Sequence, residues 1–235
     1  MKIGLAVYEF RNRDTAFNLS QMERAMRSAR GKADLLCFGE AFLQGFDAFD
    51  WTYEADRERA VPADAEIIKR LCGMTARYGV DLLFGYLERA EDALYSSCAV
   101  LAEGKLIHNY RRISKGWKEY TRTDGHYREG TETGAFRYRG QPIVIALCGD
   151  LWDFPERFRT DGLLIWPVYV NFTLEEWAGQ EAAYAEQARR AASRTLLVNS
   201  LSREPESHGG AFSFVDGRAA ERLAYDTEGI LTVEL

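Results

Sequence analysis

Short apolar runs recur along the chain, and between them lie stretches in which apolar side chains return every three or four residues. Such runs are typical of strands buried on both faces, and the spaced stretches are typical of amphipathic helices. Strands are predicted at residues 2–8, 33–40, 80–88, 95–105, 106–111, 140–150, 162–168, 195–201 and 210–218. Helices are predicted at residues 15–32, 63–78 and 174–194, with a short one at 155–161.

Two more segments near the end of the chain, residues 220–225 and 229–235, have the pattern of a closing pair of strands. Strands and helices alternate through most of the sequence, which predicts an α/β fold with buried strands. No linker, low-complexity tract or short repeat interrupts this order. A single domain over residues 1–235 is therefore expected.

Composition and charge narrow the class of protein. Hydrophobic residues make up 46% of the chain and charged residues 28%, as in ordinary soluble proteins. The net charge of -6 argues against a nucleic-acid partner or an anionic membrane surface. The first apolar run is too short for a secretory signal, and no stretch approaches the roughly 20 apolar residues of a membrane span. A cytoplasmic location is expected.

The cysteines and histidines give no sign of a metal site. The four cysteines are widely spaced and contain no CxxC pair, so neither a zinc site nor a disulfide framework is indicated. The three histidines are isolated from one another in sequence. No cofactor and no metal are expected.

Three of the predicted strands end in charged or reactive residues. One ends at Glu40, one at Arg112 and one at Cys148, which is followed by Gly149 and Asp150. Ligands gather at strand ends in open α/β folds. If the three ends meet, the carboxylate can take the proton of the thiol, and the cation can stabilise the oxyanion. The amide N–H of Gly149 would be a second oxyanion donor.

Each of these residues also has an ordinary structural interpretation. A lone cysteine at a strand end is usually a small apolar side chain. Glu40 has the features of a cap or a surface charge, and Asp150 those of a cap of the next turn. Residue types and spacing thus allow a cysteine hydrolase without requiring one.

The order of several blocks resembles the nitrilase superfamily of carbon–nitrogen hydrolases. The sequence "ADLLCFGEAFLQGF" is similar to the glutamate block of that superfamily, "LYSSCAVLAEGKLIHNYRR" to the strands that lead to its lysine, and "VIALCGDLWDFPERFR" to its cysteine block. The opening "KIGLAV" and the tail "GQEAAYAEQARRAASRTLLVNSL" also match in kind. Each block alone is a weak signal, and their order and spacing make the resemblance strong.

The resemblance implies a four-layer αββα sandwich, commonly assembled as a homodimer or larger homo-oligomer, and a Glu-Lys-Cys triad. Carried over, Glu40 is the general base and Cys148 the nucleophile. Glu119 is similar to the second glutamate of the family, because it lies seven residues after the lysine position. Trp117 and Lys118 fall where residues that bind substrate are expected.

Three positions depart from the family pattern. Gly39 stands where proline usually precedes the glutamate, and Gly149 stands where an aromatic residue often follows the cysteine. Arg112 occupies the place of the lysine, and an arginine cannot donate a proton near neutral pH. Lys115 and Lys118 lie just downstream in a chain that has only six lysines. Arg112 and Lys115 are therefore rival candidates for the cation, with Lys118 third.

The function favoured by these features is hydrolysis of a non-peptide C–N bond in a small amide through a cysteine acyl-enzyme. One alternative is a catalytically degenerate homologue that binds a small molecule, with Arg112 at the lysine position. Another is a cysteine acyltransferase. The loops at residues 46–60 and 115–134 are rich in aromatic residues and are expected to set specificity.

Overall fold

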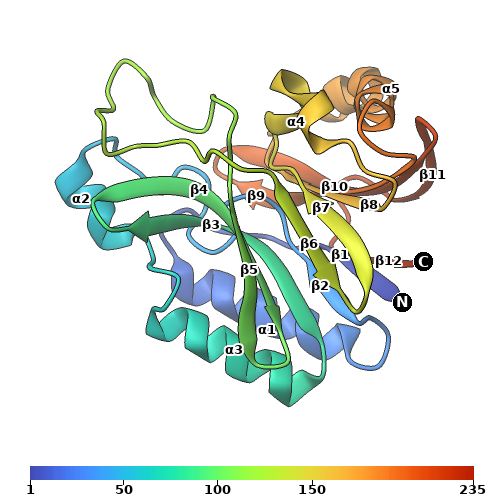
Figure 1. Cartoon of the computed structure of the whole chain (residues 1–235), viewed down its shortest axis with the longest axis horizontal. Helices are drawn as coiled ribbons and strands as arrows, with labels where there is room; N and C mark the ends of the chain where they lie inside the picture. Colours follow the sequence, from blue (N-terminus) through green and yellow to red (C-terminus); the bar gives the residue numbers. More distant parts are fainter.

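The computed structural model describes all 235 residues, which form two six-stranded mixed sheets. The first sheet has the order β12 (Gly229–Glu234), β1 (Lys2–Val7), β2 (Leu35–Cys37), β3 (Asp81–Ala90), β4 (Ala93–Ala102) and β5 (Lys105–Arg111). The second has the order β11 (Arg218–Leu223), β10 (Glu206–Val215), β9 (Arg194–Arg203), β8 (Leu163–Val168), β7 (Gln141–Ile145) and β6 (Gly134–Tyr138). The two sheets pack face to face (Figure 1).

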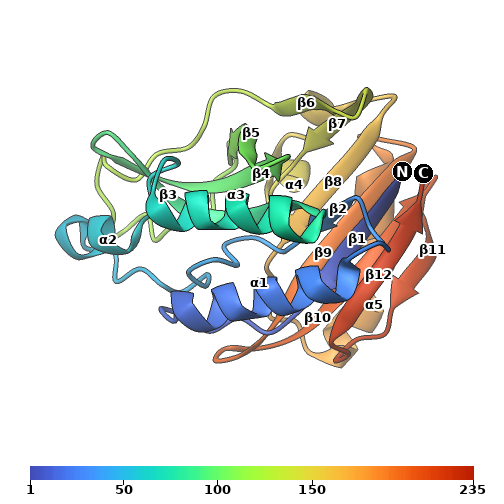
Figure 2. The same ribbon diagram turned by 90° about the horizontal axis from the view of Figure 1, so that it is seen from below.

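Helices cover the outer face of each sheet. Figure 2 shows α1 (Thr15–Ala29) and α3 (Glu66–Tyr78) side by side on the first sheet. The outer face of the second sheet carries α4 (Asp150–Asp153) and α5 (Leu174–Arg189) (Figure 1). None of the helices combines the length and the apolar character needed to cross a bilayer. The predicted four-layer αββα sandwich is confirmed.

Strand β2 shows how the sequence produces these layers. Successive side chains of a strand point to opposite faces of the sheet. Leu35 and Cys37 belong to the large core that includes the second sheet, whereas Leu36 and Phe38 belong to the core beneath the helices α1 and α3. Because both faces are buried, the segment is a continuous apolar run rather than an alternating one.

The predicted pairing of the last two strands is wrong. β11 pairs with β10 in the second sheet, and β12 pairs antiparallel with β1 in the first. The two strands therefore end different sheets, and the N- and C-termini lie side by side (Figures 1 and 2). Their apolar patterns indicated strands correctly, but partner choice depends on contacts distant in sequence.

Two elements lie in segments for which no strand or helix was predicted. Strand β6 (Gly134–Tyr138) forms a hairpin with β7, and α2 (Tyr53–Arg59) interrupts the loop at 46–60. The short helix at 155–161 is a 3-10 turn over Pro155–Phe158. Helix α2 thus lies within one of the expected specificity loops, and β6 begins where the other ends.

Asp150 joins the ends of two strands that come from different sheets. The side chain is fully buried and accepts hydrogen bonds from the hydroxyl of Tyr110 at 2.6 Å and from the N–H of Leu147 at 2.8 Å. It also accepts from the N–H groups of Ile113 and Ser114, at 3.1 and 2.8 Å. Asp150 thus ties the segment after β5 to the segment after β7, rather than only capping its own turn.

We expect Asp150→Asn to lower the free energy of unfolding by about 1–3 kcal/mol, because an amide nitrogen in place of Oδ2 leaves the buried N–H of Leu147 without an acceptor. Urea denaturation at pH 7 measures this loss. The matched control is Asp153→Asn in the same short helix, where the side chain is exposed and the change should stay within about 0.5 kcal/mol. Equal losses in both variants would contradict the joining role.

Candidate active site

The three predicted strand ends meet where the two sheets face each other. Glu40 follows β2, and its N–H donates to the carbonyl of Val168 at the end of β8 in the other sheet, at 3.2 Å. Gly85 on β3 lets this turn approach, since a Cβ there would lie 2.6 Å from Cα of Glu40. Gly39 has no room for a side chain either, because a Cβ would lie 2.5 Å from Oγ of Ser200. The glycine at the usual proline position is therefore a packing requirement.

Arg112 and Glu40 form a buried ion pair. Their side chains are 3% and 0% exposed, and Nη1 of Arg112 lies 2.9 Å from Oε1 of Glu40. Ser96 on β4 donates to the same Oε1 at 2.9 Å. Burial by itself lowers the pKa of Arg112, but the negative charges around it, that of Glu40 first and that of Asp150 among the others, together outweigh this effect, so the pKa stands above its ordinary value. The guanidinium therefore remains charged at every pH at which the protein is folded.

The other two nitrogen atoms of Arg112 are held by the segment that follows it. Nε donates to Oγ of Ser114 at 2.8 Å, and Nη2 donates to the carbonyl oxygen of Lys115 at 2.7 Å. A guanidinium has five N–H donors. One further N–H on each of Nη1 and Nη2 is left for other partners.

Cys148 lies on a tight turn with strained backbone geometry. Its φ of 41° is in the left-handed region, which non-glycine residues seldom occupy. The turn is fixed on both sides, because the N–H of Cys148 donates to the carbonyl of Pro167 at 3.0 Å and its carbonyl accepts from Nε1 of Trp166 at 2.9 Å. Backbone strain of this kind gathers at functional sites.

The thiol of Cys148 is neutral in the resting protein. Burial raises its pKa to about 12, and the negative charge of Glu40 contributes to the rise while Arg112 acts in the opposite direction. The sulfur lies 3.8 Å from the carbonyl oxygen of Tyr169. Oε2 of Glu40 is buried and has no hydrogen-bond partner in the protein, so it is free to accept a proton. A neutral thiol needs such a base before it can attack.

The N–H of Gly149 donates to no group of the protein. Gly149 is only partly buried, as is Cys148. A free amide directly after Cys148 is the arrangement expected of an oxyanion donor if the thiol acts as a nucleophile.

The structure does not bring the other predicted site side chains to the thiol. Lys115 contributes its carbonyl oxygen, but its side chain is exposed, with Nζ 5.5 Å from the ring centre of Tyr120. Lys118 donates to the carbonyl of Tyr127 and pairs with Glu129 at 3.1 Å. These partners hold both lysines within the loop at residues 115–134, so Arg112 is the cation that reaches Glu40.

Glu119 and Trp117 lie elsewhere in the same loop. Glu119 is exposed, and its side chain makes no hydrogen bond or ion pair with the protein. Trp117 is buried in a small cluster with Ala41, Phe49 and Tyr127, next to the turn that carries Glu40. Trp117 therefore packs against that turn. No contact of the Glu119 side chain supports the role that the resemblance implies for it.

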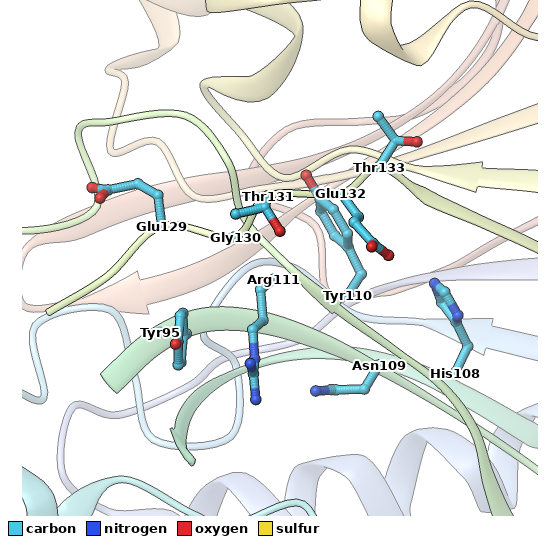
Figure 3. A pocket seen from close by; sticks show the side chains of 10 residues that line it. All are labelled: Tyr95, His108, Asn109, Tyr110, Arg111, Glu129, Gly130, Thr131, Glu132 and Thr133. Carbon is cyan, nitrogen blue, oxygen red and sulfur yellow. The ribbon is translucent and has the colours of Figure 1, made fainter. Parts of the chain in front are cut away.

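The neighbouring residue Arg111 belongs to a different cavity. A polar cavity of about 390 Å³ lies between β5 and the segment at residues 129–133 (Figure 3). Arg111 stands beside Tyr95 there, 4.1 Å from the ring centre, and pairs with Glu88 at 2.7 Å. Since successive residues of a strand face opposite sides, Arg111 points away from the ion pair that Arg112 makes.

Two serines that donate hydrogen bonds to buried carboxylates were not identified from the sequence. Ser96 and Ser97 interrupt an otherwise apolar strand, and both hydroxyls donate to buried carboxylates, those of Glu40 and Glu88. Polar residues inside a buried strand pattern are the signal that could have identified them, because buried polar groups require partners.

Comparisons with known proteins agree with this architecture. Residues 2–198 match the family model described as carbon-nitrogen hydrolase. An (R)-stereoselective amidase from Pseudomonas sp. is 26% identical over 159 residues, which cover 68% of this chain and 55% of that protein. A glutamine-dependent NAD(+) synthetase from Thermotoga maritima is 26% identical over 137 residues, or 58% of this chain and 23% of that protein. The chain thus spans only part of the length of these curated relatives.

Solved structures share the whole fold at low sequence identity. An amidase from Nesterenkonia sp. superimposes with a TM-score of 0.80 at 17% identity and covers 100% of this chain and 90% of that one. A superfamily protein from Xanthomonas campestris, XC1258, gives a TM-score of 0.79 at 19% identity, with 99% and 89% covered. Together with the family match over most of its length, this shows that the chain belongs to the carbon-nitrogen hydrolase family, within the nitrilase superfamily.

Proposed function

We propose that this protein hydrolyses a non-peptide C–N bond in a small amide through a covalent acyl-enzyme on Cys148. The observation that carries the proposal is the buried pair of Glu40 and Arg112 beside a neutral thiol, with Oε2 of Glu40 free of other partners. The likeness to an amidase from Pseudomonas sp. and to the fold of one from Nesterenkonia sp. supports the choice of an amide.

In acylation, Glu40 takes the proton of the thiol as sulfur attacks the carbonyl carbon. The electron pair of the carbonyl moves to its oxygen, which becomes an oxyanion. The free N–H of Gly149 is one donor for this oxyanion, and the unused N–H groups of Arg112 supply positive charge next to it. The negative charge therefore passes from Glu40 to the reacting atoms without leaving the neighbourhood of the guanidinium.

In the second half of the step, the C–N bond breaks and the leaving nitrogen takes the proton from Glu40. Arg112 cannot supply that proton, because its guanidinium remains charged. Water then gives a proton to Glu40 and attacks the thioester carbon, and the C–S bond breaks as sulfur recovers the proton. Glu40 thus accepts or donates the proton in each of these steps.

The second candidate is a homologue that binds a small molecule without turnover. The observation that favours it is that all three nitrogen atoms of Arg112 already have protein partners, so the cation is less free than a flexible lysine would be. A cysteine acyltransferase is the third candidate. It would form the same acyl-enzyme and pass the acyl group to an amine.

Assembly into a homodimer or larger homo-oligomer is proposed on the face formed by α5 and β11. A groove there is lined by apolar residues that include Leu174, which is 49% exposed, Ala178 and Ala182. A second copy of the chain is the occupant that the resemblance implies. Leu174→Glu should shift the mass measured by light scattering toward the monomer, and an unchanged mass would count against this face.

The first test measures the turnover of a panel of small amides and of p-nitrophenyl acetate. The intact mass of the protein is then measured to detect an acyl adduct on Cys148. Cys148→Ala should abolish the acyl adduct and the activity. Glu40→Gln should lower amide turnover by about 10²–10⁴-fold, because it removes the general base. The loss should be smaller for the ester, whose leaving group needs no proton.

Three outcomes separate the candidates in that assay. An acyl adduct with release of the acid supports the hydrolase. An adduct whose breakdown depends on added amine, with little release in water, supports the acyltransferase. No adduct on Cys148 with any amide or ester supports the binding homologue and overturns the proposal.

The second test follows the pKa of the Cys148 thiol through its alkylation by iodoacetamide, mapped by peptide mass. In the parent the rate should keep rising well above pH 9, because burial and Glu40 raise the pKa to about 12. Glu40→Gln removes a negative charge and should move the midpoint to lower pH, whereas Arg112→Gln removes a positive charge and should move it higher. Shifts in the same direction would contradict the assigned charges.

Cys72 is the internal reference for this experiment. It is also partly exposed, and burial is the cause of the rise in its pKa. Its alkylation profile should therefore be the same in all three proteins.

A further inference from the structure

Gly149 is not explained by the conformation of its backbone. Its φ and ψ are -62° and -14°, in the ordinary right-handed region that every residue adopts. Glycine in such a conformation is less favourable than alanine, because it loses more conformational freedom on folding. The reason for a glycine at this position must therefore be the space that a side chain would take.

That space is occupied by Arg112. A Cβ on residue 149 would lie 2.4 Å from Nη2 of Arg112, closer than real Cβ atoms approach another heavy atom. It would also lie 3.1 Å from Oγ of Ser114 and 3.4 Å from the carbonyl oxygen of Lys115. The severe contact is with the guanidinium alone, and the other two are tight or ordinary.

Arg112 is not free to move aside. The three hydrogen bonds to Glu40, Ser114 and Lys115 fix the plane of its guanidinium, and the side chain is 3% exposed. A shift of Nη2 away from residue 149 would rotate the whole group. The bond from Nη1 to Oε1 of Glu40 would then stretch or break.

We propose that Gly149 is a positioning residue that adapts this site to an arginine in place of the lysine. Two of the three departures from the family motifs, those at Arg112 and Gly149, are then one paired change. A lysine has no atom equivalent to Nη2, so it does not need the space that Gly149 leaves. The inference rests on the proposed function only in that the cation acts on Cys148.

The effect of Gly149 reaches the reaction through Glu40. With Oε1 held by Arg112 and Ser96, Oε2 is the oxygen left for the thiol. Displacing the guanidinium would release Oε1 and remove the positive charge that lowers the pKa of Cys148. Gly149 therefore controls the thiol through Arg112, in addition to offering its own N–H.

The test is a double-mutant cycle of the parent, Gly149→Ala, Arg112→Lys and the double variant. The readout is the rate of Cys148 alkylation by iodoacetamide at pH 8, which needs no turnover, together with the thermal unfolding midpoint. In the arginine background we expect Gly149→Ala to slow alkylation by about tenfold or more. In the lysine background the same substitution should change the rate by less than about twofold.

The matched control is Gly179→Ala in α5, where the backbone is helical and a Cβ would meet nothing within 4 Å. It should leave the alkylation rate unchanged with either residue at position 112. An equal penalty for Gly149→Ala in both backgrounds, or none in the arginine background, would overturn the pairing. If Gly149→Ala fails to fold, recovery of the unfolding midpoint in the double variant supports the pairing, and no recovery overturns it.

The outcome is separable from that of the proposed function. Coupling in the alkylation cycle with no amide turnover in any of the four proteins would support the pairing of Arg112 with Gly149 and contradict the proposed hydrolase function. Additive effects on alkylation in a protein that hydrolyses amides would contradict the pairing and leave the hydrolase function supported.

Discussion

The ion pair between Glu40 and Arg112 is the interaction on which the site depends. Two charges buried from water carry a large desolvation penalty, and an ion pair offsets it only when further hydrogen bonds satisfy the remaining groups. Here Ser96 supports the carboxylate, while Ser114 and the carbonyl of Lys115 support the guanidinium. Removing one partner from such a pair typically costs about 3–5 kcal/mol, because the other charge stays buried. Stability and chemistry therefore rest on the same contacts.

The sandwich is what allows these groups to meet. Glu40 and Arg112 follow strands of the first sheet, and Cys148 follows a strand of the second. The backbone bond from Glu40 to Val168 and the four bonds to the carboxylate of Asp150 fix the two sheets to each other at this point. A rigid frame of this kind can hold Cys148 at a positive φ, since the surrounding bonds outweigh the local strain.

The strands and the residues at their ends were predicted from local patterns, whereas the four layers followed from the resemblance to the nitrilase superfamily. Buried strands show continuous apolar runs, and Glu40, Arg112 and Cys148 interrupt such runs. Contacts between distant segments left no signal of that kind. The assignment of β11 and β12 to different sheets depends on β1 at the opposite end of the chain. The role of Lys115 was also hidden, because its carbonyl oxygen rather than its amine enters the site.

An arginine at this position changes how protons move in the site. A lysine amine is a point charge that can lose its proton, whereas a guanidinium is a fixed planar charge that keeps it. The cation of this site can therefore steady a thiolate or an oxyanion, but it cannot act as an acid. In the proposed hydrolysis every proton therefore passes through Glu40, whose Oε1 is held by Arg112 and whose Oε2 has no protein partner. Because one oxygen serves every transfer in that proposal, the orientation of the carboxylate matters as well as its charge. Arg112 and Ser96 both hold that orientation through Oε1, and Gly149 leaves the space that the guanidinium occupies.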